Sequence, residues 1–361
     1  MSNTAAESTL AEQIDRLAVP GTLYARLDKD AVRCLACAHR CLIHDGRRGI
    51  CQVRFTAGGT LYVPHGYVAG LHSDPIEKKP FFHVYPGTKA LTFGMLGCDL
   101  HCSFCQNWLT TQALRDPEAG IAPTAISAQE IIAMGQRAGA RAVISSYNEP
   151  LITSEWAVEV FQQARPAGLI CGFVSNGNAT PEVLDYLRPW ADCYKIDLKT
   201  MSDRNYRQLG GVLDNILEGI RMAHARGFWV EVVTLVVPGF NDSDDELHQA
   251  AEFIASVSAD IPWHVTAFHP DYKMTGPGHT SLQTLLRAAR IGQEAGLHYV
   301  YIGNQPGRVA EFENTYCHVC HELLVERSGY HIRSYGITSE GTCPRCQARI
   351  PGIWDTMAPH E

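Results

Sequence analysis

The sequence lacks long apolar runs, an excess of basic charge and low-complexity segments. No run of 18 or more apolar residues occurs in its 361 residues, so the sequence offers no ordinary membrane-spanning helix. The opening, MSNTAAESTLAEQIDRL, lacks the basic-then-apolar order of a secretory signal. A net charge of −8 and a pI near 6.0 give no basic footprint for nucleic acid. We therefore expect a cytoplasmic protein that binds neither nucleic acid nor membrane.

Cysteine, in contrast, is plentiful. Eleven of the thirteen cysteines fall into three short clusters, which is spacing typical of metal ligands rather than of a disulfide framework. The other two, Cys171 and Cys193, lie in apolar strand-like runs, and we interpret them as small buried hydrophobic residues.

From about residue 90, brief β-rich runs alternate with helical segments. Helix starts are indicated by Ser127 with Glu130 three residues later, by Thr180 before Pro181, and by the acidic run at 242–246. The expected strands are ALTFGML at 90, RAVISSY at 141, LICGFVS at 169, DCYKIDL at 192, FWVEVVTLVV at 228, PWHVTAF at 262 and LHYVYI at 297. The glycines expected to end helices before strands are Gly139, Gly168, Gly227 and Gly296.

Six or seven such units predict an α/β fold with a parallel sheet covered by helices. A partial (β/α)6-type barrel is favoured over a flat doubly wound sheet, although strand order cannot be read from one sequence. The expected segments are an N-terminal helical lead-in (1–29), a four-cysteine module (30–55), a connecting segment (56–89), the core barrel (90–305) and a zinc-ribbon-like C-terminal module (306–361).

The middle cysteine cluster, GCDLHCSFCQNW at 97–108, follows the first core strand, where a barrel carries its active-site loops. At these short intervals Cys98, Cys102 and Cys105 can bind three corners of a cubane iron–sulfur cluster, which leaves the fourth iron without a protein ligand. A structural zinc site would need a fourth ligand. His101 could supply it, but its place beside Cys102 strains simultaneous coordination.

The two outer clusters each hold four cysteines. The N-terminal one, CLACAHRCLIHDGRRGIC, contains Cys34, Cys37, Cys41 and Cys51. Four thiolates suit a closed site, either zinc, which we favour, or an additional iron–sulfur cluster. The C-terminal one contains Cys317, Cys320, Cys343 and Cys346. Its paired CxxC spacing predicts tetrahedral zinc, and we interpret the neighbouring His318 and His321 as surface residues.

The loop CDLHCSFCQNW resembles the CxxxCxΦC motif of radical S-adenosylmethionine (SAM) enzymes, with Phe104 as the aromatic residue before the last cysteine. The resemblance implies that Cys98, Cys102 and Cys105 hold a [4Fe–4S] cluster whose open iron is chelated by SAM. It also implies reductive cleavage of SAM to a 5′-deoxyadenosyl radical that abstracts a substrate hydrogen atom. An electron donor such as flavodoxin or ferredoxin is implied as well.

Motifs over roughly 90–275 are similar to those of the pyruvate formate-lyase activating enzyme branch. SSYNEP at 145–150 and VSNGN at 174–178 end two strands, and KIDLK, VVPGFND and AFHP end the next three. By resemblance, Asn148 and Glu149 meet the methionine amino group, because a carboxylate suits an ammonium, and Asn176 meets the methionine carboxylate or the ribose. The further cofactor-contacting candidates are Asp197, Lys199 and His269. Taken alone, each of these residues could be an ordinary turn or surface residue. Together they follow consecutive parallel strands, whose ends meet at one mouth of the barrel, where barrel enzymes carry their active sites.

The chain also resembles a more specific family, the radical enzyme of AMMECR–Memo–radical SAM three-gene systems. The resemblance lies in the order of three features: the early four-cysteine segment, then DPIEKKPFFHVYPGT at 74–88, then the radical loop. This implies Memo-like and AMMECR-like partners and a protein or peptide substrate. Two alternatives stay open. One is a glycyl-radical-enzyme activase, although Val233 stands where activases commonly have arginine. The other is a non-enzymatic zinc-binding scaffold. The substrate itself has no transferable sequence code.

Overall fold

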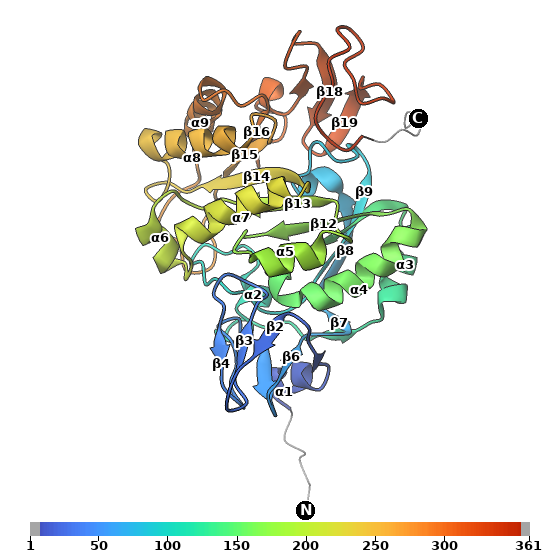
Figure 1. Ribbon diagram of the computed structural model, residues 1–361. Coiled ribbons are helices and arrows are strands. Elements are labelled where there is room, and N and C mark those ends of the chain that lie inside the picture. Colours follow the sequence, from blue (N-terminus) through green and yellow to red (C-terminus); the bar gives the residue numbers. More distant parts are fainter. Residues whose placement is uncertain (1–7, 355–361) are drawn as a thin grey trace, which may run out of the picture.

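An eight-stranded sheet forms the centre of the protein, seen here in a computed structural model that describes residues 8–354 (Figure 1). Its strands are β8 (Gly70–Pro75), β9 (Lys89–Gly94), β11 (Ala140–Ser145), β12 (Ile170–Ser175), β13 (Cys193–Asp197), β14 (Trp229–Val236), β15 (Trp263–Ala267) and β16 (Val300–Gly303). Strand β9 and strands β11 to β16 are parallel and lie side by side in chain order. A doubly wound sheet would reverse its strand order. The predicted fold, an α/β partial barrel, is therefore confirmed.

The eighth strand was not expected. β8 pairs with β9 in antiparallel register, with Gly70 opposite Gly94, and becomes one edge of the sheet while β16 is the other. Part of the segment that the sequence assigned to a connector therefore belongs to the central sheet.

Helices cover the outer face of the sheet. They are α3 (Ala128–Arg137), α4 (Ser154–Ala164), α5 (Pro181–Leu187), α7 (Leu213–Ala225), α8 (Asp244–Val257) and α9 (Leu282–Glu294). The remaining short elements after β9 are α2 (Trp108–Thr111), which follows the cysteine loop, α6 (Asp203–Gln208), and the 3-10 turns η2 (Pro150–Thr153), η3 (Arg165–Ala167) and η4 (Ala310–Phe312). The capping box of Ser127 and Glu130 and the Thr180 cap are present as predicted, and Ser243 caps α8. Within residues 8–354, none of the helices has both the length and the apolar character needed to span a bilayer.

Alternating strand residues build two separate cores. Val143, Phe173, Tyr194 and Val265 belong to the large apolar cluster that also contains the helices. Intervening residues face the barrel interior, where a smaller apolar cluster includes Ile144. Cys171 belongs to the first cluster and Cys193 to the second, and both are fully buried as predicted.

The segment after β8 closes the amino-terminal end of the barrel. It begins with η1 (Ile76–Lys78) and runs below the strands. Glu231 of β14, fully buried, accepts hydrogen bonds from the backbone N–H of Phe82 (3.0 Å) and His83 (2.9 Å) and from Trp229 Nε1 (3.0 Å). His264 Nε2 lies 2.7 Å from the same carboxylate. The stretch 74–88 is thus held as the floor of the barrel.

Two small modules lie at opposite ends of the barrel (Figure 1). The N-terminal one contains α1 (Leu10–Asp15), β1 (Val19–Pro20), β2 (Tyr24–Arg26), β3 (Val32–Cys34), β4 (Leu42–Ile43), β5 (Phe55–Ala57) and β6 (Thr60–Val63), followed by β7 (Tyr67–Val68), which pairs with β10 (Thr124–Ala125). The C-terminal one is an antiparallel sheet of β17 (Thr315–Tyr316), β18 (Leu323–Ser328) and β19 (His331–Tyr335). Of the expected helical lead-in, residues 8–29 hold one six-residue helix and two short strands, and residues 1–7 lie outside the described chain.

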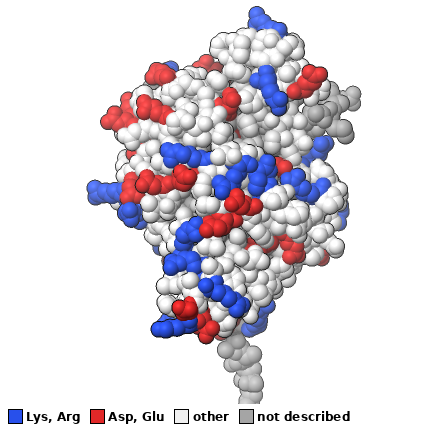
Figure 2. All heavy atoms as spheres, in the orientation of Figure 1, with Lys and Arg blue, Asp and Glu red and all other residues white. Residues whose placement is uncertain are grey.

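Basic and acidic side chains interleave on the face shown in Figure 2. Arg226 lies 2.7 Å from Asp185, and Arg165 lies 2.9 Å from Asp192. Groups of both signs of charge therefore lie next to one another on this face.

Glu231→Ala should strongly destabilise the protein, because four converging groups lose their buried acceptor. We expect a loss of about 3–5 kcal/mol in the free energy of unfolding, measured by chemical denaturation. Glu218→Ala is the control: that side chain is mostly exposed and forms a 3.7 Å surface pair with Arg221, so the change should stay within about 0.5 kcal/mol. Equal stability of the two variants would contradict the role assigned to the floor.

Candidate functional site

The Cys98 loop leaves the carboxyl end of β9 and ends at α2. Gly97, with φ +92°, allows the N-terminal module to approach: a Cβ at this position would lie 2.7 Å from Val53 Cγ1 and 3.0 Å from the Cys51 carbonyl oxygen. Phe104 is buried and its ring meets that of Phe240 edge-on, 5.5 Å between centroids. The loop is therefore held firmly, and Phe104 serves as part of its packing.

The three loop thiols occupy surroundings that oppose ionisation. Burial raises the pKa of Cys98 well above its usual value and raises that of Cys102 to about 12, although Lys199 acts in the opposite direction on Cys102. Cys105 Sγ lies 3.3 Å from Thr111 Oγ1, and the Leu100 N–H donates to Cys98 Sγ at 3.4 Å. Thiols in such surroundings become thiolates when a metal is bound, which makes them suitable ligands and poor free nucleophiles.

His101 has a different role from the one its position suggests. Its ring packs on Gly210, where an added Cβ would come within 2.4 Å of Cε1. The structure thus gives it a packing role.

Asp99 connects the Cys98 loop to the end of β12. The carboxylate is fully buried and accepts hydrogen bonds from Asn176 Nδ2 (2.7 Å) and Asn178 Nδ2 (2.8 Å). His39 Nε2 of the N-terminal module lies 3.8 Å from Oδ2, the oxygen that Asn178 also contacts. Sequence reasoning missed Asp99 and Asn178, although both lie inside the quoted motifs, because nothing in those motifs says which polar residue turns inward.

Glu149 lies beside Asp99 and is buried as well. Its carboxylate accepts hydrogen bonds from Ser175 Oγ (2.7 Å), Asn176 N (2.7 Å) and Leu151 N (3.0 Å). Burial and then the charge of Asp99 raise the pKa of Glu149 well above its usual value, despite these donors. Two carboxylates this close would be stabilised by a bound cation.

Asn148 is tied to the backbone instead. Its Oδ1 accepts from Met95 N (3.0 Å), and its Nδ2 donates to the Glu149 carbonyl oxygen (3.2 Å). It therefore joins the ends of β9 and β11.

Asp197 is held between two lysines. Lys195 Nζ pairs with Oδ1, and Lys199 Nζ lies 3.2 Å from Oδ2. Burial raises the pKa of Asp197, but the two ammonium groups outweigh it and hold the pKa at about 2. Lys195 was not singled out from the sequence, since its inward orientation follows from its register on β13.

His269 lies at the outer rim. Its side chain is 48% exposed, its Nδ1 lies 3.3 Å from Gln106 Nε2, and its Nε2 lies 3.6 Å from Asp271. The same segment donates from Lys273 N to the Ser103 carbonyl oxygen at 2.9 Å. The structure thus brings His269 next to the cysteine loop.

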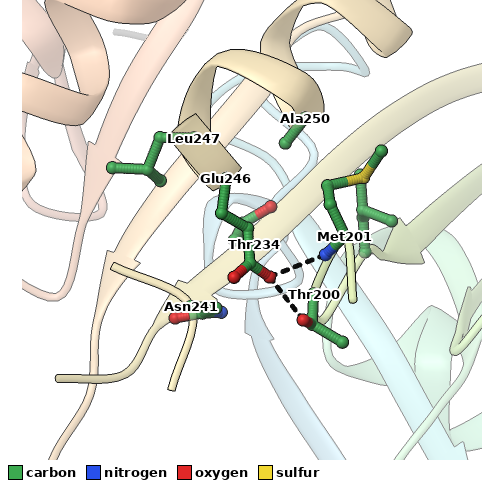
Figure 3. A pocket seen from close by; sticks show the side chains of 8 residues that line it. Thr200, Met201, Thr234, Asn241, Glu246, Leu247 and Ala250 are labelled. Atoms are coloured by element: carbon green, nitrogen blue, oxygen red, sulfur yellow. Dashed lines mark hydrogen bonds between the residues drawn. The ribbon is translucent and has the colours of Figure 1, made fainter. Parts of the chain in front are cut away.

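The hollow in Figure 3 lies beside the mouth, outside the barrel. Its volume is about 10 Å³, which is room for one water molecule. On its wall, Glu246 accepts from Met201 N (2.7 Å) and pairs with Thr200, while Asn241 Nδ2 donates to the Lys199 carbonyl oxygen (2.7 Å). These contacts fix the loop that carries Lys199, so the hollow supports the site and is no substrate pocket.

The outer cysteine groups differ in spacing. The four C-terminal sulfurs all lie within 4.8 Å of one another, with Cys317 and Cys346 3.6 Å apart and Cys320 and Cys343 3.6 Å apart. The N-terminal sulfurs show no such convergence among the described residues.

Comparison with known proteins agrees with this arrangement. The model of the Radical SAM superfamily matches residues 93–254, which run from β9 into α8. An uncharacterised protein of Methanocaldococcus jannaschii is 36% identical over 330 residues, covering 91% of this chain and 97% of that protein. The chain belongs to the radical SAM superfamily.

Within the superfamily, this protein is similar to glycyl-radical activases. Pyruvate formate-lyase 1-activating enzyme of Escherichia coli (strain K12) is 25% identical over 227 residues, covering 58% of this chain and 91% of that enzyme. A solved domain of a pyruvate-formate lyase-activating enzyme from Bacteroides vulgatus covers 45% of this chain and 99% of that domain, at 19% identity and a TM-score of 0.40. Superfamily membership implies a [4Fe–4S] cluster and SAM.

Asp99→Ala should weaken the fold at the mouth, because two buried amides lose their acceptor. We expect a loss of about 3 kcal/mol in the free energy of unfolding, measured by denaturation. Asp99→Asn keeps one acceptor oxygen and should lose roughly half as much. Wild-type stability in both variants would show that the two amides are satisfied in another way.

Proposed function

We propose that this radical SAM protein modifies a protein or peptide substrate and works with partner proteins. The SAM-binding part of the proposal is carried by the buried pair of Asp99 and Glu149 beside the three-cysteine loop, at the end of the barrel where parallel strands finish. Such a pair favours a ligand with an ammonium group, and SAM carries one beside its carboxylate. The protein or peptide substrate and the partners are what the family resemblance implies.

The proposed ligands of the [4Fe–4S] cluster are Cys98, Cys102 and Cys105. Their sulfurs lie on one loop but do not converge on a single point, as suits thiolates that bind different irons. When bound and reduced, this cofactor supplies the electron that cleaves SAM to methionine and a 5′-deoxyadenosyl radical. The chain's part is to hold the loop, orient SAM and exclude water.

The proposed SAM contacts come from the ends of five strands, β9, β11, β12, β13 and β15. Glu149 takes the methionine ammonium, with Asn148 holding the backbone that carries it. Asn176 offers its amide to the methionine carboxylate or the ribose. The remaining contacts are proposed for Asp197, Lys199, His269 and Phe104, the last by supporting the loop. Because Asp197 is already paired with two lysines, we assign it to orienting Lys199.

Partners and outer metals complete the proposal. An electron donor such as flavodoxin or ferredoxin would reduce the cluster, and Memo-like and AMMECR-like proteins are the proposed partners. The C-terminal group of Cys317, Cys320, Cys343 and Cys346 is proposed to hold zinc, which its close sulfur spacing supports. The five segments expected from the sequence are proposed as the division of the chain, except that β8 of the connecting segment joins the central sheet.

A glycyl-radical-enzyme activase is the second candidate. Similarity to the E. coli activating enzyme over 91% of that enzyme's length favours it. Val233, which is buried on β14, replaces the arginine expected of activases and speaks against it. The two outer modules are also not needed for activation alone.

Replacing Cys102 by Ser should abolish SAM cleavage, whereas His101→Ala should leave it nearly intact. The first change removes an iron ligand, and the second removes a ring that packs on Gly210. Anaerobic protein with dithionite and SAM is assayed for 5′-deoxyadenosine and for iron content. A colourless wild-type protein that contains only zinc would support the scaffold alternative and refute the enzyme.

Co-expression with candidate targets separates the two enzyme hypotheses. We expect a mass change in a protein or peptide partner that depends on SAM and on Cys102, and no glycyl radical. Mass spectrometry and EPR of the same samples provide the two measurements. A glycyl-radical EPR signal in a partner would instead establish the activase.

A further inference from the structure

The four C-terminal cysteines serve as a reference for the sulfur spacing expected around a single zinc ion. Four thiolates around one tetrahedral zinc, each at about 2.3 Å, lie about 3.8 Å from one another. The C-terminal cysteines match this, since two sulfur pairs are 3.6 Å apart and all four fall within 4.8 Å. The backbone there is arranged for a single ion.

The N-terminal cysteines do not match it. Cys34 N donates to the Cys41 carbonyl oxygen at 3.0 Å, and the N–H of Ile50, the neighbour of Cys51, donates to Cys41 Sγ at 3.5 Å, so these cysteines lie side by side. Within residues 8–354, however, no three of these sulfurs lie all within 4.8 Å of one another. The Cys98 loop has the same open spacing, although its three cysteines also lie on one short loop. Open spacing suits thiolates that each bind a different metal atom of a cluster.

The surroundings also suit thiolates that carry a cluster. Cys34 and Cys37 are buried, and so is the guanidinium of Arg54, whose Nη1 lies 3.7 Å from Cys34 Sγ. The Ile50 N–H donates to Cys41 Sγ at 3.5 Å. Hydrogen bonds to sulfur are among the means by which proteins set the reduction potential of an iron–sulfur cluster.

From this geometry we infer that the N-terminal module holds a second iron–sulfur cluster, ligated by Cys34, Cys37, Cys41 and Cys51, beside the cluster of the Cys98 loop. The zinc favoured by the sequence would need the four sulfurs to close around one ion.

Hydrogen bonds connect the N-terminal cysteine module to the Cys98 loop. Arg115 donates to the carbonyl oxygens of Cys98 (2.8 Å) and Leu100 (2.9 Å) and also pairs with that of Ile50, next to Cys51. On the other side, Ala38 N donates to the Asn178 carbonyl oxygen at 2.8 Å. One side chain thus separates the two metal-binding loops, which brings the second cluster close to the first.

Metal counts in the full-length chain test the second cluster. Anaerobic protein reconstituted with iron and sulfide is compared with the Cys98→Ala/Cys102→Ala/Cys105→Ala variant and with the Cys34→Ala/Cys37→Ala variant. The Cys34→Ala/Cys37→Ala variant should keep about four irons and the triple variant about two to four, each with matching sulfide and visible absorption. Cys171→Ala, a buried cysteine outside every group, is the matched control and should retain all the iron. Zinc should stay at one per chain throughout.

The outcomes are distinct. A triple variant with no iron and two zinc ions per chain would overturn the second cluster. If the Cys34→Ala/Cys37→Ala variant fails to fold, EPR of the reduced wild type decides: two iron–sulfur signals are expected, of which SAM shifts one, and a single signal refutes the inference. If the protein holds two clusters but does not cleave SAM, the inference of a second cluster is supported and the proposed function is contradicted.

Discussion

The buried carboxylate of Asp99 is the contact on which the mouth of the barrel depends. It belongs to the three-cysteine loop after β9, yet its hydrogen bonds come from Asn176 and Asn178 after β12. One side chain therefore fixes the loop that carries the cysteines against the loop proposed to contact SAM. A buried charge is tolerated there because both oxygens are satisfied by amide donors.

Charge is distributed unevenly across the same mouth. On one side Asp99 and Glu149 share a buried region, where burial and then the charge of Asp99 raise the pKa of Glu149. On the other side Asp197 is matched by Lys195 and Lys199. SAM has a cationic end and a carboxylate, so a site with separate acidic and basic sides would orient it.

Much of the fold could be predicted because it follows from local rules. The seven parallel strands and the caps at Ser127 and Thr180 depend on hydrophobic runs and on short-range hydrogen bonds. β8 was not predicted because its sequence, GLHSDP, is only weakly apolar and forms a strand by pairing with β9. The inward orientation of Lys195 could not be predicted either, because it depends on the position of this residue on β13 within the assembled sheet.

By itself the sequence determined which residues are available and in what order: three cysteine groups, polar residues after successive strands, and the signature loop of the radical SAM superfamily. Tertiary structure decided which of them meet. It turned His101 onto Gly210, brought Asp99 to two asparagines nearly eighty residues away, and gave the two outer cysteine groups different spacings. Spacing along a chain limits how far apart two sulfurs can be, but only the packed backbone fixes the distance at which they are held.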